Sequence, residues 1–325
     1  MLRCFIIPTI LILGCFPTSS HDSDETLLQV TVQDKELIGY QAMPLVNPKG
    51  GEQFKGSNFI HPLKTPSGFI VTEIQPDDHL HHFGLWWPWK YIEIEGRQVL
   101  CWELQDGDGL VQAQNSRLTS DGFTATSVYI DRKASEGPRN LISETLHVKI
   151  SEIIEHPVTG YSLDLEILHK TAIDIPVTAL KYRYSGFAFR GTSKWNRNNS
   201  TVLTSECKDY DASNFTRAKW VRVEGSAEEG HTAGVLIMSC PLNYDHPELL
   251  RTWDSRSHNG AVFINFNSVQ NRSWRFEPGK QYIRRFRVFV YDGTLTFEQA
   301  DDMRKAYVKS ISTNPSSESV FPEEM

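Results

Sequence analysis

Residues 77–87 read DDHLHHFGLWW and gather ionisable and aromatic side chains in one short stretch. A histidine titrates near neutral pH, so one of them, oriented by Asp77 or Asp78, would serve as a general acid or base. A second chemistry is metal binding, with His79 and His81 (or His82) as ligands and a carboxylate from elsewhere completing the shell. The stretch therefore predicts a catalytic or metal-binding site.

A third chemistry for the same stretch is sugar binding. Imidazoles and Asp78 would hydrogen-bond hydroxyl groups while Trp86, or a neighbouring tryptophan, stacks on a sugar face. Trp86 and Trp87 point to opposite faces of an extended chain, so we expect at least one of them in the core. The alternative without function is a histidine-rich turn whose rings cap backbone groups.

Pro76 breaks any strand before the cluster, which places DDHLHH in a loop or at a strand end. Functional side chains tend to lie on loops that a rigid scaffold holds. If the segment is extended, His79 and His81 point one way, and His82 shares the other face with Asp78.

Four residues elsewhere in the chain are further candidates for this site. Arg190 ends an alternating segment and would hold a carboxylate or a sugar oxygen, or form a structural ion pair. Asn243 and His246 lie in the Pro-bounded loop PLNYDHP and would add substrate contacts, or serve only as turn residues. Glu103 follows a strand and would supply a carboxylate to the histidines.

The elements that must position these residues read as strand after strand. Alternating or β-branched segments occur at 27–34, 68–74, 90–96, 97–104, 122–131, 144–156, 161–172, 178–191, 219–225, 232–240, 260–266 and 281–293. One helix is indicated after them by the capping box Thr296-Phe-Glu-Gln299, with Ala300, Met303, Ala306 and Tyr307 on one face. The sequence predicts an all-β fold, a large antiparallel β-sandwich with one short C-terminal helix.

The two ends of the chain lack the strand patterns of the central segment. Residues 1–20 resemble an export signal, with Arg3 before an apolar run too short to span a bilayer. ILGC at 12–15 leaves open a lipoprotein signal, which would anchor Cys15 to a membrane. We expect a linker at 21–26, a single β-sandwich domain at 27–309 and a disordered tail at 310–325. The protein would then be exported: periplasmic, an outer-membrane lipoprotein or secreted.

The composition of the chain argues against several classes of binding partner and catalytic site. The net charge is −7 and no basic block stands out, so we expect no nucleic acid. The body carries only Cys101, Cys207 and Cys240, which is not a disulfide framework. The sequence lacks a G-x-S-x-G nucleophile motif, a Gly-rich phosphate loop and a C-x-x-C pair.

GFIVTEIQPDDHLHHFGLWWPW resembles the signature of the PmoA-like domain family, a family of unknown function in secreted bacterial proteins. That family has T-P-x-G followed by P-x-D-H-x-H-H-x-G-x-W. TPSG at 65–68 corresponds to the first part, and the second is matched by Pro76, Asp78, His79, His81, His82, Gly84 and Trp86. Further similar blocks, covering about 58–307 in all, are YSGFAFRG (184–191, with Arg190), AKWVRVEG (218–225), CPLNYDHP (240–247) and YDG (291–293).

The resemblance implies an exported all-β domain, similar to the galactose-mutarotase-like supersandwich, in a carbohydrate-processing setting. The methane monooxygenase of the family's name has a transmembrane subunit, and this sequence has no such segments past its first twenty residues, so we expect no methane monooxygenase activity.

These patterns favour an enzyme that uses the His/Asp cluster for acid–base chemistry on a carbohydrate or small-molecule substrate, as a hydrolase, lyase or epimerase. One alternative is a metal-dependent enzyme with a divalent ion on His79 and His81. Another is a non-catalytic carbohydrate-binding module. The sequence predicts no cofactor beyond that possible ion, and it leaves the substrate and the reaction open.

Overall fold

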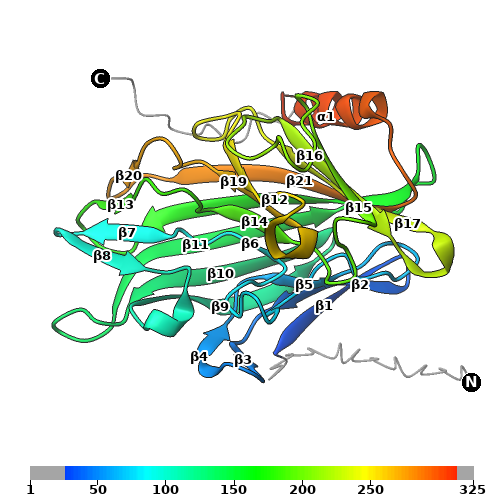
Figure 1. The fold of residues 1–325 in the computed structure, drawn as a ribbon. Coiled ribbons are helices and arrows are strands. Elements are labelled where there is room, and N and C mark those ends of the chain that lie inside the picture. Colours follow the sequence, from blue (N-terminus) through cyan, green and yellow to red (C-terminus); the bar gives the residue numbers. More distant parts are fainter. Residues whose placement is uncertain (1–25, 313–325) are drawn as a thin grey trace, which may run out of the picture.

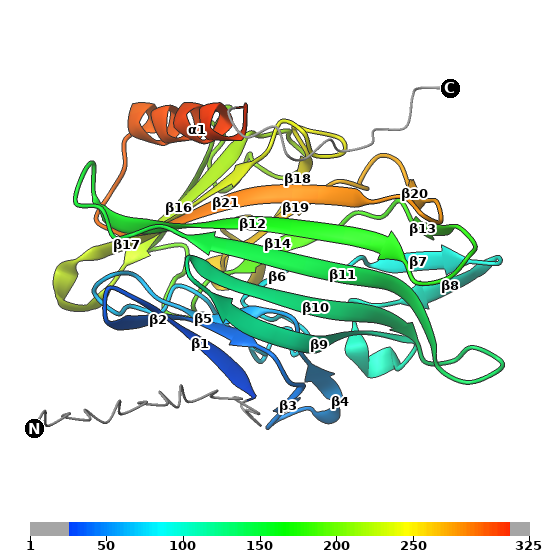
Figure 2. The same cartoon turned by 180° about the vertical axis from the view of Figure 1, so that it is seen from behind.

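Two large antiparallel sheets face each other in the computed structural model, which describes residues 26–312 (Figures 1 and 2). The first is seven-stranded, in the order β1 (Leu27–Val32), β2 (Lys35–Gln41), β5 (Ile60–Leu63), β6 (Leu85–Trp86), β14 (Phe187–Arg190), β19 (Phe263–Asn267) and β18 (Leu249–Thr252). The second is eight-stranded, in the order β15 (Ser200–Thr204), β16 (Trp220–Ser226), β17 (Thr232–Ser239), β21 (Tyr282–Asp292), β12 (Thr159–Thr171), β11 (Arg139–Ile150), β10 (Gly122–Asp131) and β9 (Gly109–Thr119).

Smaller elements surround this sandwich. A four-stranded sheet has the order β20 (Trp274–Phe276), β13 (Val177–Ala179), β7 (Tyr91–Ile94) and β8 (Arg97–Leu100), and a hairpin pairs β3 (Leu45–Asn47) with β4 (Gly51–Gly56). Short 3₁₀ turns are η1 (Leu104–Asp106), η2 (Glu228–Gly230) and η3 (Ser257–Gly260). The helix α1 (Phe297–Ser312) lies beyond β21 at one end of the large sheet (Figure 1).

The main core lies between the two large sheets, and alternation along the strands decides which side chains enter it. On β14, Phe187 and Phe189 join this core, whereas Ala188 points to the outer face of the seven-stranded sheet. On β6, Leu85 joins the main core and Trp86 points to the outer face. The outer face therefore carries its own aromatic cluster, and Arg190 lies two residues after Ala188 on that face.

The structure confirms the all-β antiparallel sandwich and the single C-terminal helix. The capping box is present, since Thr296 N donates to Gln299 Oε1 (2.8 Å) and Gln299 N donates to Thr296 Oγ1 (3.2 Å). Ala300 and Tyr307 are buried as expected, but Ala306 is exposed. The helix also continues to Ser312, past the predicted domain end at 309.

Two predicted strands are wrong. Residues 68–74 form only isolated bridges, among them Thr72 with Gly191. The segment 178–191 is divided between β13 and β14, because the chain turns at Gly186 with a φ of 79°. The export signal at 1–20, Cys15, the linker up to 25 and the tail from 313 lie outside the described residues. No helix within residues 26–312 is long and apolar enough to cross a membrane.

Gly84 fixes where the DDHLHH loop returns to the sheet, immediately before β6. Its φ is 62°, and a Cβ placed there would lie 2.6 Å from the carbonyl oxygen of Ile60 on β5. A side chain would have to push the loop off its neighbouring strand. Only glycine satisfies both the backbone conformation and the close approach.

Gly84→Ala should therefore destabilise the protein by roughly 2–5 kcal/mol, combining left-handed strain with a backbone clash. Gly107→Ala is the matched control, because Gly107 has a φ of 69° but no atom within 4 Å of its would-be Cβ. That variant should lose only about 1–2 kcal/mol. Urea unfolding of both variants measures the difference, and equal losses would show that the contact with Ile60 is unimportant.

Candidate functional site

The segment 75–82 forms two consecutive turns rather than an extended chain. His79 N donates to Pro76 O (2.9 Å) and His82 N donates to His79 O (3.0 Å), while Gln75 N donates to His82 O (2.7 Å) and closes the loop. The expected loop is present, but the strand-like alternation of its histidines is not. The His79 ring stacks on His82 with centroids 4.6 Å apart, and it meets His81 edge-on at 5.5 Å.

Backbone hydrogen bonds join this loop to the end of β14. Arg190 N donates to Gly84 O (2.7 Å), and Glu73 N donates to Arg190 O (3.0 Å). The side chain at the end of β14 is thereby held next to the histidine loop, although the two are more than a hundred residues apart in sequence. This brings Arg190 and Asp78 together.

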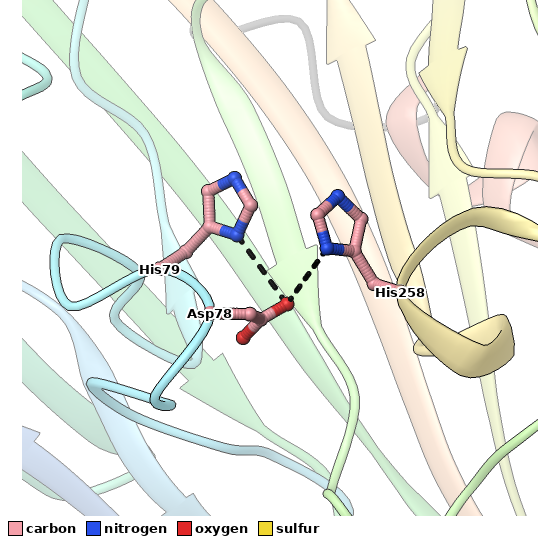
Figure 3. A group of neighbouring side chains, drawn as sticks. All are labelled: Asp78, His79 and His258. Carbon is pink, nitrogen blue, oxygen red and sulfur yellow. Dashed lines mark ion pairs between the residues drawn. The ribbon is translucent and has the colours of Figure 1, made fainter.

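Asp78 is the centre of the group (Figure 3). Arg190 Nη2 donates to both of its carboxylate oxygens, at 2.9 and 3.0 Å. His79 Nδ1 lies 3.3 Å from Asp78 Oδ2, and His258 Nδ1 lies 3.5 Å from the same atom. Burial acts to raise the pKa of Asp78, but the nearby His79 and Arg190 outweigh it and hold that pKa well below its usual range. The carboxylate is therefore ionised at neutral pH.

His258 is a member that the sequence did not single out. It lies in η3, where His258 and Asn259 have φ angles of 48° and 59°, and this turn directs its ring to Asp78. Burial, with the charge of His79, lowers the pKa of His258. In sequence it is one histidine in the polar loop DSRSHNG, and no spacing relates it to the cluster at 77–82.

Aromatic side chains support the group from behind. Trp253 lies 4.8 Å from His79 and 4.1 Å from His258 between ring centroids, and the Arg190 guanidinium lies 4.7 Å from its ring. His82 is buried against Trp253 and Phe263, and burial lowers its pKa well below the usual value. His82 is 2% exposed and backs the ring of His79, so its side chain supports the site and does not face the cavity.

Trp86 does not occupy the predicted sugar-stacking position. It is 2% exposed and packs between His82, Trp102 and Phe263 on the outer face of the sheet. Side chains alternate along β6, so Leu85 points into the core between the sheets and Trp86 points to the outer face. No face of its ring is open to a sugar.

Glu103 belongs to a neighbouring polar cluster. It pairs with Lys90 and accepts a hydrogen bond from Tyr184 Oη, while Lys90 Nζ donates to Tyr184 Oη at 3.1 Å. Burial lowers the pKa of His81 to about 4, and the nearby Glu103 only partly opposes this. His81 is therefore neutral at physiological pH, and Glu103 is paired with Lys90 instead of a histidine.

Asn243 and His246 lie in a different place. Asn243 is buried, donates to Glu248 Oε1 (2.9 Å) and accepts from Arg285 N (2.7 Å). His246 Nδ1 lies 3.0 Å from Ser239 Oγ in the same network. These contacts fasten the 240–248 loop to β17 and β21, and neither residue is part of the cavity wall beside Asp78.

A cavity of about 780 Å³ opens onto the group, with Asp78, Arg190 and His258 in its wall. The β3–β4 turn, residues 73–77 and residues around 193–196 form the rest of the wall. A second cavity of about 930 Å³ shares Glu73 and Ser193 with the first. Its wall includes Ser67 of TPSG and Asp292 of YDG, which are hydrogen-bonded to each other (Ser67 N to Asp292 Oδ2, 2.8 Å).

Solved structures offer only distant likenesses. A putative kojibiose phosphorylase from the human microbiome has 11% identity over 76% of this chain and 26% of its own, with a TM-score of 0.34. The GH36 alpha-galactosidase AgaA from Geobacillus stearothermophilus has 8% identity over 72% of this chain and 33% of its own, with a TM-score of 0.33. This chain thus spans about a third or less of the length of these proteins. Its fold is assigned from its own strand pairing and not from these likenesses.

Family comparison is more direct. No curated protein matches the sequence. A model of one family of unknown function, DUF6807, matches residues 27–305, which is nearly all of the described chain. The protein therefore belongs to the DUF6807 family.

Proposed function

We propose that this protein is an exported enzyme that acts on a carbohydrate, with Asp78, His79, His258 and Arg190 in its active site. The observation that carries the proposal is the convergence of two imidazoles and a guanidinium on one carboxylate at the wall of a cavity. Ionisable groups gathered in a cleft with shifted pKa values are typical of catalytic sites. Simple recognition of hydroxyl groups does not require them.

The arrangement provides for proton transfer. Asp78, ionised and held by Arg190, orients the two rings through Nδ1, which leaves Nε2 of His258, a residue of the cavity wall, available for exchange with a substrate. Since burial keeps His258 mainly neutral, it is suited to accept a proton. Hydrolysis, elimination and epimerisation of a sugar all need such a step.

The cavity favours a polyhydroxylated substrate. Its volume of about 780 Å³ falls within the usual range for ligand sites, roughly 300–1,000 Å³. The more exposed amide and hydroxyl side chains in its wall match sugar hydroxyl groups as hydrogen-bond partners: Ser193, Asn196 and Asn259. The adjoining cavity would receive further units of a longer glycan. The sequence resemblance to the PmoA-like family, whose members are secreted proteins of carbohydrate-degrading bacteria, also supports a carbohydrate substrate.

Asp78→Asn should lower turnover by about 100-fold or more, because the rings lose the charge that orients them. His258→Ala should act similarly. The assay is a polysaccharide panel in which new reducing ends and unsaturated products are measured. His147→Ala is the control, since His147 is exposed on β11 and should leave turnover unchanged. Glycan binding by the unsubstituted protein without any turnover would instead indicate a binding module.

Arg190→Lys should lower turnover by roughly 10–100-fold, because an ammonium group cannot hold both oxygens of Asp78 while packing on Trp253. Arg217→Lys is a matched change at another Arg–Asp pair, with Asp245, outside the cavity wall. It should retain full turnover. Steady-state kinetics with circular dichroism measures both variants, and equal losses would assign Arg190 a purely structural role.

A further inference from the structure

Three potential ligand atoms lie at the centre of this site (Figure 3). They are Asp78 Oδ2, His79 Nδ1 and His258 Nδ1, and a set of ligand atoms from these residues lies within 4.8 Å of one another. Both rings direct Nδ1 to the same carboxylate oxygen, at 3.3 and 3.5 Å. Two imidazoles and a carboxylate are the ligand types that zinc and iron(II) accept in proteins.

The two separations from Asp78 Oδ2 are compatible with a set of metal ligands. Charge-assisted N–H···O bonds are about 2.7–2.9 Å long. Ligands held about 2.0–2.2 Å from a tetrahedral ion lie roughly 3.3–3.6 Å apart, along the edges of the tetrahedron. Both measured distances fall in the second range. Independently, His79 Nδ1 is buried and makes no hydrogen bond of normal geometry with any described residue.

We propose that Asp78, His79 and His258 bind one divalent first-row transition-metal ion, with a further coordination position open to the cavity. This inference rests on the proposed carbohydrate activity of the same site, but with Nδ1 of His79 and His258 on an ion, a metal-bound water would take over the proton transfer that the two rings would otherwise perform. A bound ion of this kind polarises a substrate oxygen or lowers the pKa of a water ligand. The ligand pair differs from the predicted one, because η3 directs His258, and not His81, to the carboxylate of Asp78.

Neighbouring side chains hold the three ligands in place. Arg190 holds the Asp78 carboxylate through hydrogen bonds to both of its oxygens, as outer hydrogen bonds do in metal sites. Trp253 contacts both imidazoles, and His82 backs His79. Arg190 Nε and Nη1 are buried without a partner among residues 26–312.

The test is metal binding by the full chain without a histidine tag. Elemental analysis and calorimetric titration with ZnCl₂, MnCl₂ and, without oxygen, FeSO₄ should show one ion per chain with micromolar or tighter affinity. His79→Ala and His258→Ala should each abolish this, and His81→Ala and His147→Ala should not. Circular dichroism checks folding, and His258 lies in a surface turn that alanine should not unfold. The same ion should raise the melting temperature of the unsubstituted protein but not of His258→Ala.

Absence of binding by all three metals, or binding that survives His258→Ala, would overturn the inference. Chelation separates it from the proposed function. Turnover that is lost with EDTA and restored by one of the ions supports both. Turnover that persists after EDTA has removed every ion overturns the metal site and leaves the acid–base enzyme standing. A bound ion without turnover on any glycan supports the metal site and contradicts the carbohydrate activity.

Discussion

The ion pair between Asp78 and Arg190 is the interaction on which the site depends. It joins the histidine loop to the end of β14, and the backbone bonds between Arg190 and residues 73 and 84 reinforce that junction. His79 and the pair with Arg190 together hold the pKa of Asp78 low, and two imidazoles converge on one oxygen of this ionised carboxylate. Without the pair, a partly exposed carboxylate at a loop tip would have no fixed direction.

The sandwich places that junction on the outer face of its seven-stranded sheet. Alternation along β6 and β14 sends Leu85, Phe187 and Phe189 inward, and it leaves Trp86 and Ala188 for a second aromatic cluster. Trp253 and Phe263 complete this cluster and back His79, His82 and His258. The site thus rests on a rigid apolar base, while its polar atoms face the cavity between the loops. Such support is what precise catalytic geometry requires.

The sequence predicted the fold class because strand periodicity and a capping box are local signals. Strand 122–131 and the helix start agree with the structure for that reason. The site was predicted in part: the density of histidines singled out residues 77–82, and Arg190 was chosen from its place at a strand end. His258 was missed because its role arises only when η3 folds beside β14. Trp86, Asn243 and His246 lie outside the group around Asp78, because burial and loop anchoring use the same residue types as binding.

The central claim is that Asp78, His79 and His258 act together as one site for an ion at the cavity wall. Anomalous diffraction from crystals of the full chain grown with zinc tests this most directly, because it locates the ion independently of any substrate. The account predicts a single strong peak about 2.0–2.2 Å from Asp78 Oδ2 and both Nδ1 atoms. A peak on other residues, or crystals in which the three side chains are ordered around no ion at saturating zinc, would contradict it.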